Sequence, residues 1–210
     1  GGYLPLICTL NSTKVTDAAA RWLGVSLDQL AELALDAPAG DERPVLLAYL
    51  DGERTPDRPR ATGLLGGLTT ETTRNDIARA AFEGVLFGLV AGQDAISAAG
   101  ASTGGSVTAV GGGARSAAYR QFLADILQTP VLTKDLSEAT ARGACIQAAA
   151  VLAGGAVTEV RDAWAPATLT STLPRGEASV VTRARYRVLA EGPGLERAGA
   201  RTPDETRETA

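Results

Sequence analysis

Residues 109–120 read AVGGGARSAAYR and place three consecutive glycines between small apolar residues and an amphipathic stretch. Because glycine weakens both strands and helices, the triplet indicates a place where the backbone does something that side chains would prevent. A glycine turn between a strand and a helix exposes backbone N–H groups at a helix N-terminus, where the macrodipole favours an anion. The missing Cβ atoms also let a flat ring such as adenine lie against the main chain. A tight turn without a ligand explains the triplet equally well.

The turn matches neither of two common phosphate-binding motifs. No Lys-Ser or Lys-Thr pair follows at the spacing of the GxxxxGK[ST] phosphate loop. Gly111 and Gly113 supply only the first half of the GxGxxG dinucleotide fingerprint. The triplet therefore has to be interpreted together with the segments around it.

The segments on both sides of the glycines alternate between strand and helix patterns. Strands are predicted at 106–110 and 129–133, and helices at 117–128 and 138–154. Ser137 is the expected N-cap of the last helix, with Glu138 in its positive first turn. This order predicts an α/β layer in which a right-handed crossover joins two parallel strands.

The rest of the chain predicts further elements on either side of this layer. Strands or extended segments are expected at 3–10, 45–50 and 64–68, and helices at 12–22, 26–35, 73–99 and 177–191. Ser26 is the expected N-cap of the second helix, and Thr73 with Asp76 three residues later resembles a capping box. The residues from 192 to 210 are charged and almost free of large apolar groups, which predicts a disordered tail.

The helix predicted at 73–99 carries small residues at every fourth position: Ala80, Gly84, Gly88 and Gly92. Each glycine costs a helix about 1 kcal/mol relative to alanine, so tight packing has to compensate. The row therefore predicts a packing face. Its partner is either another element of the same domain or a second subunit in a homodimer.

Composition excludes several classes of function. The chain has 210 residues and a formal net charge of −4, which argues against a nucleic-acid surface rich in Lys and Arg. It contains no histidine, so His-dependent triads and His metal sites are excluded. Two isolated cysteines indicate neither a disulfide framework nor a zinc site, and no apolar run is long enough for a membrane span. A cytoplasmic protein without a metal site of its own is expected.

Four acidic or thiol side chains could be mistaken for functional groups, and each has a structural interpretation. Asp51 and Glu53 lie in a loop without any partner signal for catalysis. Glu83 is an acid within an apolar helix and is expected to pair with a polar neighbour. Cys145 stands among alanines and is expected to be a small core residue.

Several segments together resemble the C-terminal half of the FGGY carbohydrate kinases. They are YLDGERTPDRP, GLLGGLTTETTRNDIARAAFEG, VGGGARSAAYRQFLADILQTPV and EATARGACIQAAAVLAG, in the family's order and spacing. The stretch from Gly63 to Glu83 fits the family's second signature, in which Gly67–Leu68 precede Asp76–Ile77 by seven residues. GERTP at 52–56 resembles the xylulose kinase branch. The resemblance extends over roughly residues 3 to 190.

This resemblance implies an α/β fold of the ribonuclease-H-like, actin-like ATPase class, with a C-terminal FGGY domain over 1–191 that is truncated at its N-terminal end. It implies that the glycine turn lies along ATP. The residues expected to contact the nucleotide are Gly111, Gly112, Gly113, Ala114, Arg115, Ser116 and Ala117. The family often has Asn where Ala117 stands, which removes one polar contact that Ser116 could partly replace.

The resemblance also implies an ATP- and Mg²⁺-dependent phosphotransferase of xylose metabolism that phosphorylates D-xylulose. The family's catalytic base is an Asp on the N-terminal side of the cleft, which also holds most of the sugar contacts. No counterpart is found in this sequence, so the base is expected upstream of Gly1 and no catalytic residue is assigned. We therefore expect no sugar kinase activity from these residues alone. The alternative is a non-catalytic ATP-binding or assembly module with the same fold.

Overall fold

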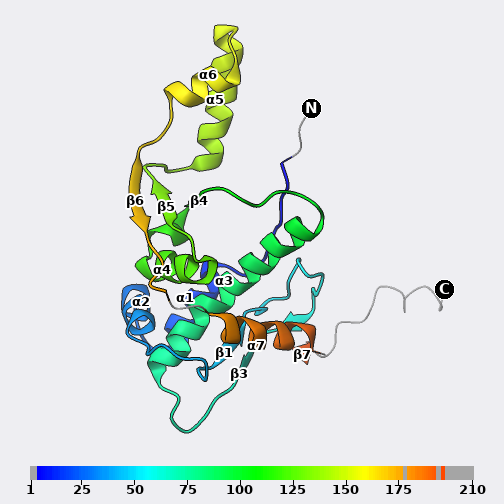
Figure 1. Ribbon diagram of the computed structural model, residues 1–210, viewed down its shortest axis with the longest axis vertical. Helices are drawn as coiled ribbons and strands as arrows, with labels where there is room; N and C mark the ends of the chain where they lie inside the picture. The colour runs from blue at the N-terminus through cyan, green and yellow to red at the C-terminus, as the bar shows by residue number, and fades with distance from the viewer. Residues whose placement is uncertain (1–3, 177–178, 193–194, 197–210) are drawn as a thin grey trace, which may run out of the picture. The chain divides into compact units, whose positions relative to one another are not determined.

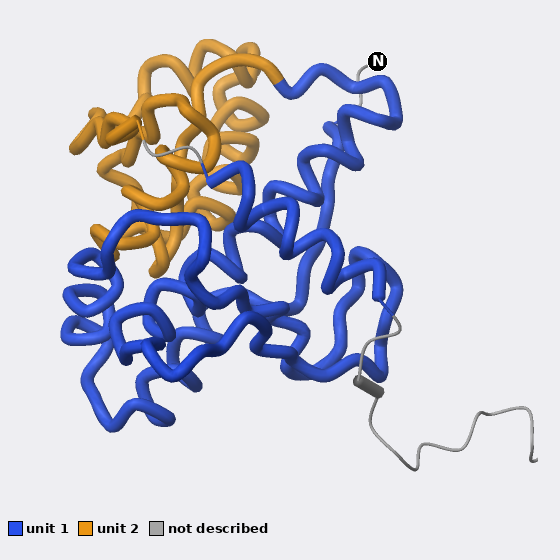
Figure 2. The backbone as a smooth tube through the Cα atoms, turned by 60° about the horizontal axis from the view of Figure 1, so that its bottom comes forward, with its two compact units in different colours: residues 1–103, 179–210 blue, residues 104–178 orange. Residues whose placement is uncertain are grey.

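The computed structural model describes residues 4–176, 179–192 and 195–196. The chain divides into two compact units, shown in different colours in Figure 2. Unit 1 comprises residues 1–103 and 179–210, and unit 2 comprises residues 104–178. Unit 2 is therefore an insertion in the sequence of unit 1. The single domain expected over 1–191 stays a prediction.

Unit 1 is built around one long helix, α3 (Figure 1). Its helices are α1 (Thr13–Leu23), α2 (Leu27–Leu35), α3 (Arg74–Ala98) and α7 (Val180–Glu191). Its strands form two antiparallel pairs: β1 (Val45–Leu47) with β3 (Leu64–Gly66), and β2 (Ala61–Thr62) with β7 (Leu195–Glu196). Helix α3 packs against α1, α2, β1 and α7, so most of the core of unit 1 surrounds it.

Local capping signals in the sequence are confirmed in unit 1. The Thr73 side chain accepts a hydrogen bond from the Asp76 backbone N–H, and the Asp76 carboxylate accepts one from the Thr73 backbone N–H. Ser26 and Gln29 make the same reciprocal pair at the start of α2. Helix α1 ends at Gly24, which has the left-handed backbone conformation of a C-cap. Helices α2 and α3 therefore begin, and α1 ends, where their capping residues predict.

The glycine row of α3 is a packing face inside unit 1. A Cβ atom added to Gly84 would lie 2.3 Å from the backbone oxygen of Leu46 in β1. A Cβ atom on Gly88 would lie 3.3 Å from the Tyr186 hydroxyl, and one on Gly92 would lie 2.6 Å from Ile7 Cγ2. The row thus lets β1, α7 and the N-terminal segment approach the helix closely.

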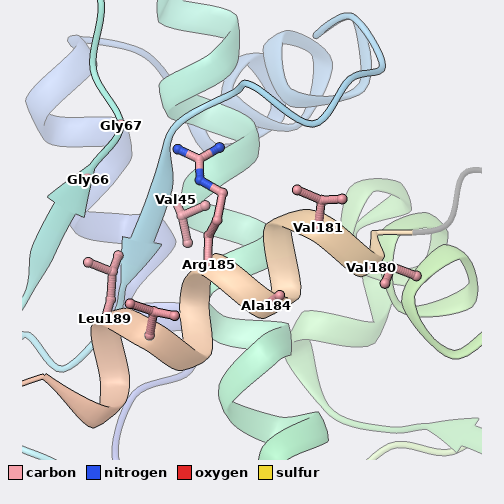
Figure 3. A pocket seen from close by; sticks show the side chains of 9 residues that line it. Val45, Gly66, Gly67, Val180, Val181, Ala184, Arg185 and Leu189 are labelled. Carbon is pink, nitrogen blue, oxygen red and sulfur yellow. The ribbon is translucent and has the colours of Figure 1, made fainter.

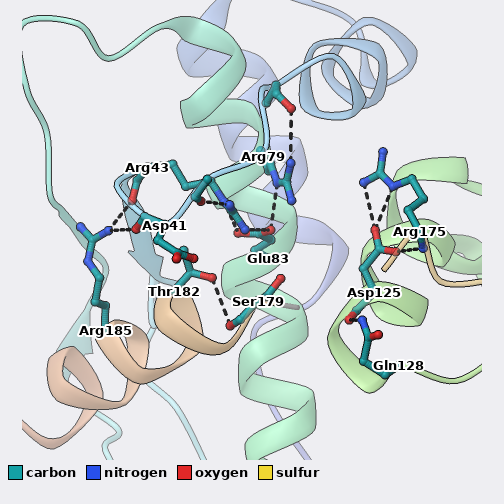
Figure 4. Close-up of polar contacts among 12 residues, drawn as sticks. Asp41, Arg43, Arg79, Glu83, Asp125, Gln128, Arg175, Ser179, Thr182 and Arg185 are labelled. Carbon is teal, nitrogen blue, oxygen red and sulfur yellow. Dashed lines mark hydrogen bonds and ion pairs between the residues drawn. The ribbon is translucent and has the colours of Figure 1, made fainter. Parts of the chain in front are cut away.

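Glu83, next to Gly84 in α3, is buried and pairs with two arginines (Figure 4). Arg79 Nε donates to Glu83 Oε1 at 2.9 Å, and Arg43 donates from Nη2 to Oε1 at 2.9 Å and from Nε to Oε2 at 3.2 Å. Arg79 also donates to the carbonyl oxygen of Ala37. The expected structural role of Glu83 is confirmed: the acid joins α3 to the loop before β1.

Unit 2 is a three-stranded sheet with four helical segments. The sheet order is β4 (Val107–Ala109), β5 (Val131–Lys134) and β6 (Thr168–Thr172), with β4 parallel and β6 antiparallel to β5. The helical segments are the 3-10 turn η1 (Gly112–Arg115), α4 (Ala117–Leu127), α5 (Ala139–Ala153) and α6 (Val157–Ala163). The parallel pair confirms the expected α/β layer. Helix α4 packs on β5 and β6, and Phe122 is among its buried side chains.

Asp125 fixes the chain that follows β6 to helix α4. Its buried carboxylate accepts hydrogen bonds from the backbone N–H, Nε and Nη2 of Arg175 at 2.7, 3.1 and 2.9 Å (Figure 4). Gln121 Nε2 donates to the same carboxylate and to the carbonyl oxygen of Leu173. The end of β6 is therefore held in a defined position on α4.

Four local predictions were wrong or incomplete. Residues 4–10 form no strand, and Leu4 and Leu6 are exposed. Ser137 does not cap α5; Glu138 occupies the N-cap position with a left-handed backbone (φ 50) and no side-chain cap bond. Cys145 is exposed on α5 rather than buried.

The fourth difference lies in the region after α5, where the sequence predicted no regular element. The structure has α6 and β6 there, and α5 and α6 pack against each other (Figure 1).

Two expectations concern the ends of the chain. Of the tail predicted at 192–210, residues 195–196 form β7, and the rest apart from Gly192 lies outside the described residues. Gly1 also lies outside the described residues. The expectation that the catalytic base lies upstream of Gly1 therefore stays a prediction.

Candidate functional site

A cavity of about 480 Å³ lies in unit 2 where β4 and β5 end. In α/β sheets, ligands bind outside the carboxyl ends of parallel strands, because the loops that follow those strands surround a common crevice. The cavity is lined by the residues after β4, the residues after β5 and the start of β6: Ala109, Val110, Gly111, Gly112, Ala114, Arg115, Arg120, Thr133, Lys134, Asp135, Leu136, Ser137, Glu138, Leu169 and Thr170.

The glycine turn forms the first wall. Gly111 has a φ of 87°, a conformation that favours glycine, and η1 follows with hydrogen bonds from Ala114 N to Gly111 O and from Ser116 N to Gly113 O. The left-handed backbone conformation therefore explains why a glycine stands at position 111. Gly112 has no such requirement, and an added Cβ would meet no protein atom within 4 Å. The missing side chain at Gly112 leaves free space along the backbone at the cavity.

Arg120 holds this turn in place from helix α4. Its Nη1 donates to the carbonyl oxygens of Ala114 and Arg115, both at 2.7 Å. Two polar atoms beside the turn, Ser116 Oγ and Arg120 Nε, are buried and have no hydrogen-bond partner among the described residues. Arg120 thus fixes the backbone of the turn, and two buried polar atoms beside it make no hydrogen bond within the described residues.

The ends of β5 and β6 form the second wall. Lys134 Nζ donates to Thr168 Oγ1 at 2.6 Å, and the hydroxyls of Thr133 and Thr170 lie 2.6 Å apart. The Asp135 backbone N–H donates to the carbonyl oxygen of Ala167. The charged residues of the whole lining are Arg115, Arg120, Lys134, Asp135 and Glu138. The cavity therefore offers cationic, hydroxyl and carboxylate groups next to the apolar side chains of Val110, Leu136 and Leu169.

The structure brings four of the seven predicted site residues to the cavity. Gly111, Gly112, Ala114 and Arg115 line it, whereas Gly113, Ser116 and Ala117 are not among its lining residues.

The other eleven lining residues were not predicted as site residues from the sequence, and Arg120, Lys134 and Leu169 are among them. Lys134 could have been found, because it ends the strand parallel to the one before the glycines. Leu169 gave no signal, since β6 itself was not predicted.

The carboxylates of the loop before β2 have structural roles. Glu53 is buried and accepts hydrogen bonds from Leu10 N at 2.7 Å, Asn11 Nδ2 at 3.0 Å and Arg54 N at 2.8 Å. Asp51 is exposed and pairs with Lys14. These contacts support the structural interpretation of both residues.

Unit 1 contains a second hollow, of about 460 Å³, between α7 and the β1–β3 pair (Figure 3). Its lining is mostly aliphatic and includes Val45, Val181 and Leu189. Its one charged residue, Arg185, donates to the carbonyl oxygens of Asp41 and Arg43 (Figure 4). This hollow brings together no groups for acid–base or phosphoryl chemistry.

Neither a metal cluster nor a membrane-spanning helix occurs in the described part of the chain. Within 4–176, 179–192 and 195–196, no group of three or more His, Cys, Asp or Glu side chains could hold a metal ion. Over the same ranges, no helix is long and apolar enough to cross a membrane.

Comparison with known proteins identifies the class. Residues 7–152 match the FGGY family of carbohydrate kinases, C-terminal domain. The chain belongs to this family, and its fold is that of the family's actin-like, ribonuclease-H-like ATPase domain. Unit 2 continues beyond the matched segment, so α6 and β6 lie outside it.

Among individual proteins, the chain is similar to xylulose kinases. It is 36% identical over 164 residues to the xylulose kinase of Streptomyces coelicolor, which covers 78% of this chain and 32% of that protein. The crystal structure of xylulose kinase from Bifidobacterium adolescentis superposes with a TM-score of 0.75 at 38% identity, covering 88% of this chain and 36% of that one. A gluconokinase of Bacillus licheniformis is 33% identical over 129 residues, which cover 60% of this chain and 25% of that protein. The chain spans about a third of the length of the xylulose kinases it matches.

Proposed function

We propose that this chain is the nucleotide-binding half of an ATP-dependent sugar kinase, and that the complete protein phosphorylates D-xylulose to D-xylulose 5-phosphate. The observation that carries the proposal is the cavity at the glycine turn, which lies where an α/β sheet binds ligands. Similarity to xylulose kinases, and at lower identity to a gluconokinase, supports the sugar class and favours the pentulose. A cytoplasmic enzyme of xylose metabolism follows from this proposal.

In the proposed complex, the glycine turn supplies a backbone surface for the adenosine, because Gly112 has no side chain to occupy the space beside it. The lining has three cations, Arg115, Arg120 and Lys134, against the two carboxylates of Asp135 and Glu138, which leaves a net positive charge for an anionic ligand. Mg²⁺ would accompany the nucleotide and neutralise charge on its phosphates during transfer. The role of these residues is to bind and orient ATP. With the catalytic base expected upstream of Gly1, these residues alone bind nucleotide without transferring phosphate.

A substitution at Gly112 tests the site without disturbing the fold. Gly112→Val places its side chain in open space, so the cavity is filled while the packing of unit 2 is kept. We expect the apparent affinity for ATP to fall at least about tenfold, since steric exclusion removes more than the roughly 1.4 kcal/mol that a tenfold change represents. Ala148→Val, on the exposed surface of α5 and outside the cavity lining, is the matched control.

The substrate is tested with the intact polypeptide that carries this sequence. Phosphate transfer from ATP is measured with D-xylulose, gluconate and glycerol as acceptors. The proposal predicts the highest kcat/KM for D-xylulose; a higher value for gluconate would reassign the sugar. ATP binding with no transfer to any of the three would favour the second candidate, a non-catalytic ATP-binding or assembly module. That candidate is kept because Ala117 replaces the family's frequent Asn.

A further inference from the structure

Strand β6 contains a β-bulge at the edge of the cavity. Thr133 of β5 pairs in register with Thr170, but the next residue, Lys134, pairs with Thr168. One step along β5 therefore corresponds to two steps along β6, and Leu169 is the residue without a register partner. Bulges of this kind change the direction of side chains and occur often next to functional sites.

The bulge lies where consecutive residues of both paired strands line the cavity, Thr133 and Lys134 in β5 and Leu169 and Thr170 in β6. Successive side chains of a regular strand point to opposite faces, and a bulge interrupts that alternation. Leu169 and Thr170 both line the cavity at the glycine turn. The extra residue breaks the alternation here, and Lys134, bonded to Thr168, fixes the chain on the other side of Leu169.

Leu169 is a large apolar side chain in an otherwise polar stretch of strand, and 62% of its surface is exposed. Val110, directly after β4, also lines the cavity and is 52% exposed. Because β4 and β6 lie on opposite sides of β5, these two side chains come from both flanks of the cavity. The lining also holds three cations, Arg115, Arg120 and Lys134, against two carboxylates. Exposed apolar groups beside a glycine backbone and a net positive charge suit a ligand with a flat apolar part and an anionic part.

We propose that Leu169, presented by the bulge in β6, is the apolar platform for the base of the bound nucleotide. The inference rests on the proposed function and adds a specificity-determining residue to it. Leu169 lies beyond residue 152, where the family match ends, so this side chain comes from a part of the chain outside the matched segment. The base lies between Leu169 and the backbone at Gly112, and the phosphates lie toward the cations.

The test compares two leucines in the intact polypeptide. Leu173, just after β6, is 63% exposed and is not among the cavity lining, so Leu173→Ala is the matched control for Leu169→Ala. Since both side chains are exposed, neither truncation leaves a cavity in the core. A second variant, Leu169→Thr, keeps a residue that strands favour and so guards against a local loss of β6. Binding of ATP, ADP and inorganic tripolyphosphate is measured by calorimetry.

Leu169→Ala and Leu169→Thr are expected to weaken ATP and ADP to a similar extent, by roughly five- to twentyfold, because apolar contact with the base is lost. Tripolyphosphate, which has no base, is expected to bind as it does to the unchanged protein, and Leu173→Ala is expected to leave all three ligands unaffected. Equal ATP affinity of the Leu169 variants and the unchanged protein would overturn this inference alone. Equal weakening by Leu173→Ala would also overturn it. Failure of the unchanged protein to bind ATP would overturn the proposed function as well.

Discussion

Replacing Gly84 with alanine should destabilise the protein, although alanine favours helices. In the interior of α3 the substitution gains about 1 kcal/mol of helix propensity. The new Cβ, however, would lie 2.3 Å from the Leu46 backbone oxygen, roughly 1 Å inside the normal contact distance. A strand carbonyl cannot rotate away, so helix and strand have to separate, which places the cost near the upper end of the range for overpacking, about 3 kcal/mol. The net expected loss is about 2 kcal/mol.

Gly88→Ala is the matched control on the same helix face. Its Cβ would lie 3.3 Å from the Tyr186 hydroxyl, the end of a side chain rather than backbone. We expect its unfolding free energy to stay within about 1 kcal/mol of the unchanged protein. For a chain of this size, a loss of about 2 kcal/mol lowers the thermal midpoint by roughly 4–8 °C, which circular dichroism resolves. If Gly84→Ala is as stable as the unchanged protein, or if Gly88→Ala loses as much, the close approach of β1 to α3 is wrong.

Two further predictions concern buried polar groups. Glu83→Gln removes the negative charge that Arg43 and Arg79 share and leaves two buried cations without a counter-charge. The free energy of unfolding, measured in urea, should therefore fall by about 3–5 kcal/mol. A fall of less than about 1 kcal/mol would contradict the buried pairing. Burial raises the pKa of the Tyr49 and Tyr186 phenols above their usual value of 10.0. The unfolded chain therefore loses these protons first as the pH rises, so the stability they contribute should be complete below about pH 10 and fall above it, by up to about 1.4 kcal/mol per pH unit for each phenol. Tyr186→Phe should reduce this alkaline loss in unfolding measured from about pH 8 to about pH 11, and an unchanged pH dependence would show that the phenol does not contribute.

Local signals allowed the helices of unit 1 to be predicted closely. A cap is made by residues three positions apart, so Ser26 and Thr73 could be recognised without knowledge of the fold. The row of small residues in α3 could likewise be interpreted as a packing face from its spacing. Its partners could not, because Leu46 and Tyr186 approach α3 only in the folded chain.

The sequence-based predictions were wrong where a strand forms only by pairing with a segment far away in the sequence. The apolar segment 4–10 has the composition of a strand, yet it has no strand partner among the described residues. Strand β6 was missed because its threonines become a strand only by pairing with β5, which lies far earlier in the chain. The bulge at Leu169 depends on that register, and no sequence pattern indicates it. The glycine turn and strand β5 could therefore be predicted, whereas the part of the wall that comes from β6 required the structure.

The position of ADP in a crystal structure of the intact polypeptide that carries this sequence would decide whether the glycine turn binds nucleotide. We expect the nucleotide in the cavity of unit 2, with its adenosine against the backbone at Gly112 and its phosphates toward the cations of the lining. ADP bound away from the glycine turn, with this cavity empty, would contradict the proposed site.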